Sequence, residues 1–325
     1  MNVSVYGAGA IGGLITARLS AAGIAVTVIA RGDTLQSLQQ HGVGLTEDDQ
    51  TRFYPVTAVS APDSLGVQDL IIIAVKQPSM NAIIKQLKPL IGEHTRVLLA
   101  MNGVPWWFFD GLPGAPADRI LNTIDPQGDL RDFIPSHQLI GCVVHLAATT
   151  LSPGIVRLNM GNNLIIGEPY GAPSEPTLRL GKILEDAGFE VEISHRIQQD
   201  IWYKLLGNMT INPVSALTRA TADRILDDPL VNQFCCKAMH EALEIGNLLG
   251  CIVTQTPEER NATTRKLGAF KTSMLQDIEA GRPLEYAALV GVVYEIAEKL
   301  GKEVPCIAAL YGLIRQLDNS QRPAD

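Results

Sequence analysis

The sequence predicts an α/β fold in which an N-terminal Rossmann-type, doubly wound sheet is followed by an all-helical C-terminal domain. The prediction rests on three observations. A glycine-rich string stands between a strand-like and a helix-like segment, apolar strand-like runs recur up to residue 193, and helical patterns alone follow. A chain of 325 residues has room for two such domains. We expect a nucleotide-binding domain over residues 1–194 and a helical substrate and dimerisation domain over residues 195–325.

The first predicted strand, residues 2–6, leads directly into Gly7-Ala8-Gly9-Ala10-Ile11-Gly12. A helical run over 14–22 and an apolar strand over 25–30 complete a βαβ unit, which is the context that a G-x-G-x-x-G motif needs. In such a motif Gly7 forms the tight turn, Gly9 lets the backbone approach a pyrophosphate, and Gly12 lets the helix pack on the strand. The pyrophosphate lies at the helix N-terminus, where amides and dipole favour an anion. The alternative is a glycine-rich turn without a ligand.

The end of the second strand is predicted to select the cofactor. NAD sites usually present Asp or Glu at this position, whereas this chain has Ala30-Arg31-Gly32-Asp33. The Arg31 guanidinium is suited to a 2′-phosphate, which favours NADP. Asp33 leaves an NAD role open, although it could equally cap the helix predicted over 34–40.

Two further predicted strands, residues 69–75 and 96–101, end in candidate ligand contacts. Lys76 follows the first of them and Asn102-Gly103 follows the second. Ligands of open α/β sheets bind outside the carboxyl ends of the strands, so Lys76 and Asn102 are candidate cofactor or substrate contacts. A solvated lysine and a simple turn are the alternatives.

Residues 104–138 are predicted to be a loop, because prolines and glycines recur there. The loop contains Trp106-Trp107-Phe108-Phe109, although aromatic residues make up only 5% of the chain. Such a cluster is expected either to pad a substrate pocket or to bury into an interface. The domain would be completed by strands over 139–149, 154–158 and 163–167, a helix over 175–187 and a strand over 189–193.

The second half carries helix start and stop signals. Helices are predicted from Asp228-Pro229 to Gly250, from the capping box at Thr256-Pro257-Glu258-Glu259 to Gly281, from Arg282-Pro283 to Gly301, and from Val304-Pro305 onward. Helical bundles of this kind often dimerise, so we expect a homodimer.

The segment 201–213, at the start of this half, is the candidate catalytic helix. As a helix it places Lys204, Asn208 and Asn212 within an arc of about 80°. Their neighbours are mostly apolar. An ammonium and two carboxamides on such a helix indicate a ligand site, while a snorkelling lysine with local hydrogen bonders is the alternative.

Composition excludes several other classes of protein. A formal net charge of −8 argues against nucleic acid and anionic membranes as partners. Five cysteines without C-x-x-C or Cys/His spacing predict no metal site and a reducing, cytoplasmic location. We also expect no signal peptide, since no apolar region precedes the first strand, and no apolar run of membrane-spanning length.

The features singled out so far are accompanied by two more in the second half, and together they follow a fixed order. They are the glycine string, Arg31, Lys76, Asn102-Gly103, the Lys-x-x-x-Asn-x-x-x-Asn-Pro pattern at 204–213, Ser273 to Ile278, and Glu285. In this combination the whole chain resembles the ketopantoate reductases (2-dehydropantoate 2-reductases). The resemblance implies NADPH-dependent reduction of a 2-keto acid, ketopantoate to pantoate in pantothenate biosynthesis. Lys204 would be the acid and substrate clamp, Asn208, Asn212 and Asn102 would bind the keto acid, and Ser273 would take its carboxylate. The residues implied to hold NADPH are Gly7, Ala8, Gly9, Ala10, Ile11, Gly12, Arg31, Lys76, Asn102, Ala147 and Glu285.

The chain departs from the family pattern at Ala222-Asp223, where many members carry Asn-Gly, and in the long loop with Trp106 and Trp107. Another 2-keto acid, larger and stacked on the tryptophans, is therefore an alternative substrate. A related β-hydroxyacid dehydrogenase, which would also pair a Rossmann half with a helical half and a catalytic lysine, is a second alternative. A non-catalytic NADP-binding sensor is a further alternative, but sensing would need none of Lys204, Asn208 and Glu285.

Overall fold

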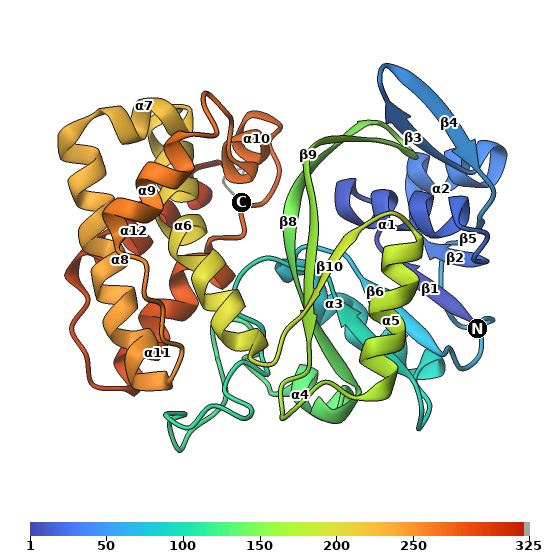
Figure 1. The fold of residues 1–325 in the computed structure, drawn as a ribbon, viewed down its shortest axis with the longest axis horizontal. Helices are drawn as coiled ribbons and strands as arrows, with labels where there is room; N and C mark the ends of the chain where they lie inside the picture. The colour runs from blue at the N-terminus through green and yellow to red at the C-terminus, as the bar shows by residue number, and fades with distance from the viewer. Residues whose placement is uncertain (322–325) are drawn as a thin grey trace. The chain divides into compact units, whose positions relative to one another are not determined.

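A computed structural model describes residues 1–321 of the chain (Figure 1). Its contacts divide the chain into two compact units. The first comprises Met1–Met101 and Asp129–Ile197, and the second comprises Asn102–Gly128 and the chain from Gln198 onward. The later division lies close to the predicted boundary at 194/195. Residues 102–128 differ from the prediction, because they group with the helical unit and not with the sheet.

The first unit is built on a mixed sheet with the strand order β4-β3-β9-β8-β7-β6-β1-β2-β5, in which β10 also pairs with β9. Strands β5, β2, β1, β6, β7 and β8 run parallel to their neighbours in that stretch, as a Rossmann-type sheet requires. The predicted fold class of this unit is confirmed. The strands are β1 Val3–Tyr6, β2 Val26–Ile29, β3 Val43–Glu47, β4 Gln50–Tyr54, β5 Thr57–Val59, β6 Leu70–Ile73, β7 Arg96–Leu99, β8 Leu139–Ser152, β9 Ile155–Gly167 and β10 Glu190–Ile193.

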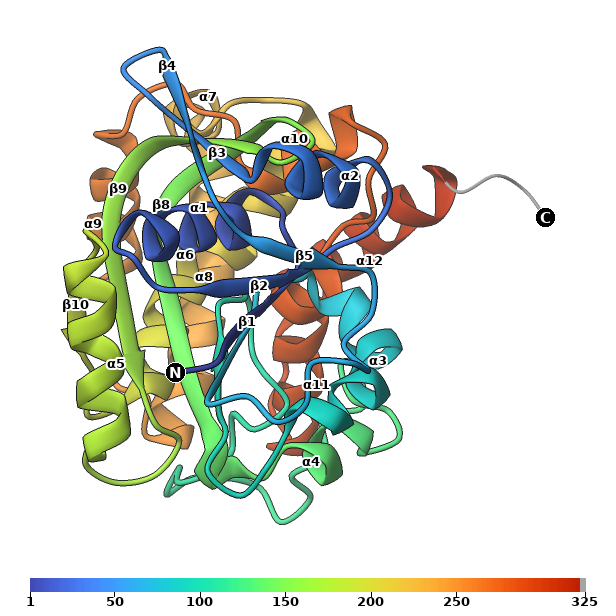
Figure 2. The same cartoon turned by 90° about the vertical axis from the view of Figure 1, so that its right-hand side faces the viewer.

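The central strands are apolar on both faces, as expected of parallel strands that are buried on both sides. All four residues of β6 are buried, for example. Helix α1 packs against β8 and β9, and α5 packs against β10 (Figure 2). The α-helices of this unit are α1 Ala10–Ala21, α2 Gly32–His41, α3 Met80–Ile83, α4 Asp129–Phe133 and α5 Glu175–Asp186, and its 3-10 helices are Gln77–Ser79, Ile84–Leu90 and Ser136–Gln138.

The two strands predicted over 154–158 and 163–167 are one continuous strand, β9. It pairs antiparallel with β8 over nearly its whole length, with register shifts that include one between His145 and Leu146. Gly161, which suggests a turn in the sequence, has φ +72° and comes so close to the His145 carbonyl that an added Cβ would lie 2.6 Å from that oxygen. The glycine therefore forms a bulge, and the ladder continues through it.

The second unit contains helices and, within the described residues beyond Ile193, no strand. Its predicted all-helical character is confirmed. Helices that begin at Pro229 and Pro305 were both expected, and the Asp228 side chain caps the first by accepting from two backbone amides. The elements are α6 Ile197–Thr218, α7 Ala222–Asp227, α8 Pro229–Leu249, α9 Pro257–Arg265, α10 Ser273–Glu279, the π-helical turn η4 Ala287–Gly291, α11 Val292–Lys299 and α12 Pro305–Gln321.

The prediction of one helix from the capping box at Thr256 to Gly281 was wrong. The box is present, but α9 ends at Arg265, Gly268 has φ +77°, and Thr272 caps a new helix, α10. The helix predicted to begin at Pro283 was also wrong. The backbone amides of Arg282 and Leu284 donate to Asp277 and Asp318, so residues 282–284 are held outside the helix that follows.

The aromatic segment 106–109 lies in the core of the second unit. Trp106 is 4% exposed and Trp107 1%, while Phe108 stacks on Trp202 of α6 with ring centroids 5.5 Å apart. Because these side chains are buried inside their own unit, the structure contradicts a subunit interface formed by them. It also leaves no exposed ring on which a larger substrate could stack. Packing on α6 is the reason that residues 102–128 belong to this unit.

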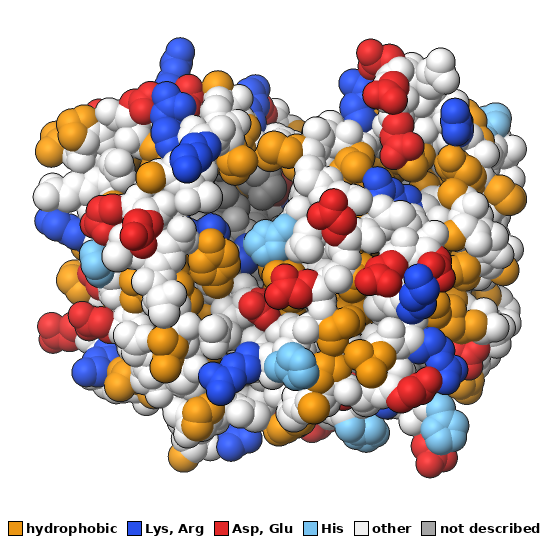
Figure 3. Space-filling view, in the orientation of Figure 1, with side chains coloured by type: hydrophobic (Ala, Val, Ile, Leu, Met, Phe, Trp, Pro, Cys, Tyr) orange, Lys and Arg blue, Asp and Glu red, His pale blue; other side chains and the backbone are white. Residues whose placement is uncertain are grey.

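No helix of the described chain combines the length and apolarity needed to cross a bilayer. On the face seen in Figure 3, acidic and basic side chains are intermixed over the surface.

Burial of Trp107 leads to a stability prediction. Trp107→Ala should lower the free energy of unfolding by about 3–5 kcal/mol, because it opens a large cavity in a packed core. Urea-induced unfolding followed by circular dichroism measures the change. The control is Leu230→Ala, whose side chain is 76% exposed and which should have little effect. Equal stability of the two variants would contradict the core assignment.

Candidate active site

Three of the predicted ligand contacts lie at one edge of the parallel sheet. β1 ends at Tyr6 before the glycine string, β2 ends at Ile29 before Arg31, and β6 ends at Ile73 before Lys76. Because β2, β1 and β6 are adjacent and parallel, their carboxyl ends share an edge. The structure thus brings the glycine string, Arg31 and Lys76 to one side of the first unit.

The glycine string has the form of a cradle for a pyrophosphate. Gly7 has φ +96°, a left-handed conformation that favours glycine. A Cβ on Gly12 would lie 1.9 Å from the Gly7 carbonyl oxygen, whereas one on Gly9 would meet nothing within 4 Å. No side chain caps the first turn of α1, which begins at Ala10, so its backbone amides can serve an anion. The backbone geometry therefore fits a dinucleotide.

Arg31 is exposed at the N-cap position of α2, beside Tyr6. Burial raises the pKa of the Tyr6 hydroxyl, and the charge and hydrogen bond of Arg31 offset part of that rise. Asp33 lies in the first turn of α2, where a negative charge is favoured by the helix dipole. Lys76 is half-buried at the N-cap position of the 3-10 helix Gln77–Ser79.

In the second unit, Lys204 and Asn102 are in direct contact. The Lys204 Nζ donates a hydrogen bond of 2.8 Å to Asn102 Oδ1, and both residues are half-buried. Asn208 and Asn212 follow on the same arc of α6, and Asn212 is 8% exposed. Neither carboxamide hydrogen-bonds to another of residues 1–321. The arrangement offers an ammonium and two carboxamides to a small polar ligand.

The backbone around Asn102 is fixed by a close approach to η4. Gly103 has φ +88°, and a Cβ there would lie 2.4 Å from the Ala288 carbonyl oxygen. That same oxygen accepts a 3.0 Å hydrogen bond from the Val104 amide. Glu285 lies three residues before Ala288, so Asn102, Lys204 and the start of this helix are parts of one assembly. The π-helical turn at Ala287–Gly291 is of a kind that occurs often at functional sites.

Ser273 and Ala147 are less closely integrated. Ser273 is exposed at the start of α10, and within the described chain its side chain makes no hydrogen bond to Lys204 or Asn208. Ala147 is exposed within β8, next to a bulge. Ala222 is fully buried, and its amide donates to the Phe270 carbonyl at 3.1 Å.

Sequence reasoning missed the role of Gly103 and the π-helical turn. The Asn-Gly pair was a signal for a turn, but the partner that requires glycine at 103 is the Ala288 carbonyl, far along the chain. No local pattern identifies such a partner.

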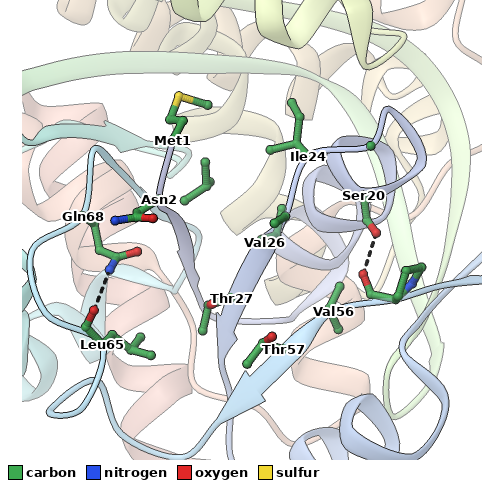
Figure 4. A pocket seen from close by; sticks show the side chains of 14 residues that line it. Met1, Asn2, Ser20, Ile24, Val26, Thr27, Val56, Thr57, Leu65 and Gln68 are labelled. Carbon is green, nitrogen blue, oxygen red and sulfur yellow. Dashed lines mark hydrogen bonds between the residues drawn. The ribbon is translucent and has the colours of Figure 1, made fainter.

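A surface hollow of about 570 Å³ lies at the opposite, amino-terminal edge of the same strands (Figure 4). It is lined by residues such as Asn2, Thr27 and Thr57 and by none of the predicted site residues. Ser20 and Gln68 at its rim donate to backbone carbonyls of Pro55 and Leu65, so their polar groups are used internally. We assign no ligand to this hollow.

Two family models match the chain. Residues 3–105 match the model described as ketopantoate reductase PanE/ApbA, and residues 196–318 match its C-terminal counterpart. A 2-dehydropantoate 2-reductase of Mesorhizobium japonicum is 38% identical over 318 residues, which cover 98% of each chain.

Solved structures agree with these matches. A protein of Ralstonia solanacearum assigned to the ketopantoate reductases is 48% identical, with a TM-score of 0.94 and coverage of 100% of this chain and 99% of the other. A dimeric ketopantoate reductase of Staphylococcus aureus, 22% identical, shares the fold with a TM-score of 0.75 and coverage of 99% and 100%. The chain belongs to the ketopantoate reductase family.

Proposed function

We propose that the chain is an NADPH-dependent 2-dehydropantoate 2-reductase, an oxidoreductase acting on CH–OH groups. It would reduce the keto group of 2-dehydropantoate to the hydroxyl group of pantoate, a step of pantothenate biosynthesis. The observation that carries the proposal is the 2.8 Å hydrogen bond between Lys204 and Asn102, in a chain aligned with a reductase of that name over 98% of its length. NADPH oxidation with 2-dehydropantoate, compared with a panel of other 2-keto acids, tests it. Faster turnover of a different keto acid would reassign the substrate.

The first unit would hold the cofactor. The amides at the start of α1, left without a side-chain cap and flanked by Gly7, Gly9 and Gly12, suit the pyrophosphate. Arg31, at the end of β2, suits the 2′-phosphate of NADP. Lys76 would contribute a further positive charge at the same edge. From the family resemblance, Ala147, Asn102 and Glu285 are proposed as additional cofactor contacts.

When bound, NADPH supplies the hydride that reduces C2 of the keto acid. The chain's own residues manage the charge that develops on the carbonyl oxygen. Lys204 stabilises that charge and donates a proton to it, which leaves a neutral amine that regains its proton from solvent. Asn102 accepts a hydrogen bond from Lys204 Nζ through its Oδ1 and so holds the ammonium group in one direction. The ammonium is thus held in place before the reaction, so the site is preorganised for the charge of the transition state.

The substrate contacts are proposed from the same geometry. The carboxamides of Asn208 and Asn212, free of hydrogen bonds within residues 1–321, can donate to the oxygens of the keto acid. Ser273, exposed at the start of α10, is proposed as a donor to its carboxylate.

A homodimer in a reducing compartment such as the cytoplasm completes the proposal. The dimeric relative from Staphylococcus aureus supports the assembly, and sedimentation velocity would measure it here. All five cysteines are free thiols, which is the state expected in a reducing compartment.

The assignment of Arg31 leads to a prediction on cofactor choice. Arg31→Ala should weaken NADPH binding by about 2 kcal/mol, the scale of a charge-assisted hydrogen bond, and should leave NADH binding nearly unchanged. Fluorescence titration of both cofactors measures the effect, with Arg52→Ala on the exposed strand β4 as the control. Equal losses for the two cofactors would rule out a phosphate contact.

The role of Lys204 leads to the second prediction. Lys204→Gln should lower kcat by roughly 100-fold or more, because an amide cannot supply the proton. The loss should appear in kcat and in kcat/KM alike, while NADPH binding survives. Lys237→Gln, at an exposed position of α8, is the matched control. A wild-type kcat in Lys204→Gln, or a loss explained entirely by cofactor binding, would show that Lys204 is structural.

A further inference from the structure

Arg260 of α9 lies directly on the helix that carries Lys204. Its guanidinium carbon is 4.3 Å from the centre of the Tyr203 ring. Its terminal nitrogen is 3.1 Å from the position that a Cβ of Gly207 would occupy. The Tyr203 hydroxyl donates to Gln255 Oε1 at 2.9 Å, which fixes the ring beneath the guanidinium. The guanidinium thus lies against α6 at Gly207, where an added methyl group would crowd it.

The charge of Arg260 is not used in an ion pair with any residue of the described chain. Its Nε is shielded from solvent and has no acceptor there. The acids of the same helix are engaged elsewhere: Glu259 accepts from the Thr256 amide, and Glu258 lies 3.7 Å from His240. By contrast Arg265, one turn further along, forms two hydrogen bonds of 2.6 and 2.8 Å with Asp227.

Stability alone does not account for Arg260. Stacking of a guanidinium on a tyrosine is favourable, but the gain is of the same order as the cost of a buried N–H without an acceptor. The two terminal nitrogens of Arg260 are not shielded in the way that Nε is and form no hydrogen bond within residues 1–321. The fork that they make is suited to a ligand with two oxygens.

Arg260 meets α6 at Tyr203 and Gly207, close in the helix to Lys204. Side chains at i and i+3 of a helix are neighbours, with Cβ atoms roughly 5–6 Å apart. The guanidinium lies against Gly207, which is position i+3 from Lys204. A carboxylate held by the Arg260 guanidinium would also be attracted by the Lys204 ammonium.

We propose that Arg260 binds the carboxylate of the 2-keto acid while Lys204 contacts the keto oxygen. This inference rests on the proposed function. The carboxylate and the carbonyl of a 2-keto acid are on adjacent carbons, and Arg260 meets α6 at Gly207, about one helical turn from Lys204. The planar guanidinium fork matches both carboxylate oxygens, and Ser273 would add a neutral donor to the same group.

Steady-state kinetics of Arg260→Met and Arg265→Met test the proposal. In Arg260→Met, KM for the 2-keto acid should rise by about 10- to 100-fold, the range of a charge-assisted hydrogen bond, with kcat and KM for NADPH little changed. Arg265→Met should behave as wild type. The methyl ester of the same keto acid lacks the carboxylate charge, so wild type and Arg260→Met should use it with the same KM.

Two further variants separate binding from folding. Arg260→Lys keeps the charge without the fork and should recover only part of the KM. Gly207→Ala keeps the arginine but crowds its terminal nitrogen by a few tenths of an ångström, and should raise KM by less than Arg260→Met does. Thermal unfolding by circular dichroism identifies any variant that fails to fold. If Arg260→Met fails, the other two variants carry the test.

The outcomes are distinct. An unchanged KM in Arg260→Met, or in Arg260→Lys if only that variant folds, overturns the proposal, as does an equal rise with acid and ester, which would make Arg260 a positioning residue. A rise in KM for NADPH alone would assign the guanidinium to a cofactor phosphate and overturn it too. If the wild type reduces no 2-keto acid, the proposed function fails. Calorimetric titration of the 2-keto acid into wild type and Arg260→Met then decides the role of Arg260 separately.

Discussion

The hydrogen bond from Lys204 to Asn102 depends on the close approach of the Asn102–Val104 backbone to the Ala288 carbonyl. Only glycine fits at 103, because its φ is +88° and a Cβ would lie 2.4 Å from that oxygen. Residues downstream secure the same segment. The buried ring of Phe108 stacks on Trp202, and the Glu295 carboxylate accepts hydrogen bonds from the backbone amides of residues 122 and 123. The geometry at Lys204 is thus set by packing well away from it.

The proposed ligands are anions, whereas the chain has a formal net charge of −8. The net charge therefore does not favour their approach, and donors at the site would have to provide the attraction. The glycine string would use backbone amides and a helix dipole, which need no charged side chain near the pyrophosphate. Arg31 in one unit and Arg260 in the other would add guanidinium groups where two oxygens must be held together.

Helix α6 combines a packed face with a polar one. Trp202, Leu205 and Met209 are buried, whereas Lys204 and Asn208 keep partial exposure. The buried face holds the helix rigidly, so the polar side chains start from fixed backbone positions. The two carboxamides have no hydrogen bonds within the part of the chain described here. A ligand that fails to pair with them would leave polar groups unsatisfied, which is a means of discrimination between substrates.

The sequence by itself determined the features that local sterics and burial control. The glycine string between β1 and α1, the buried strand β6 and the proline-initiated helices α8 and α12 were all predicted, because each depends on neighbouring residues. Only the tertiary structure decided which distant groups meet. Partners far along the chain determine three features: the continuity of β9 through Gly161, the break between α9 and α10, and the burial of Trp107 within the helical unit. The contact of Arg260 with Tyr203 and Gly207 has the same origin, since the periodicity of a helix reveals its apolar face but not which residue of another helix packs there.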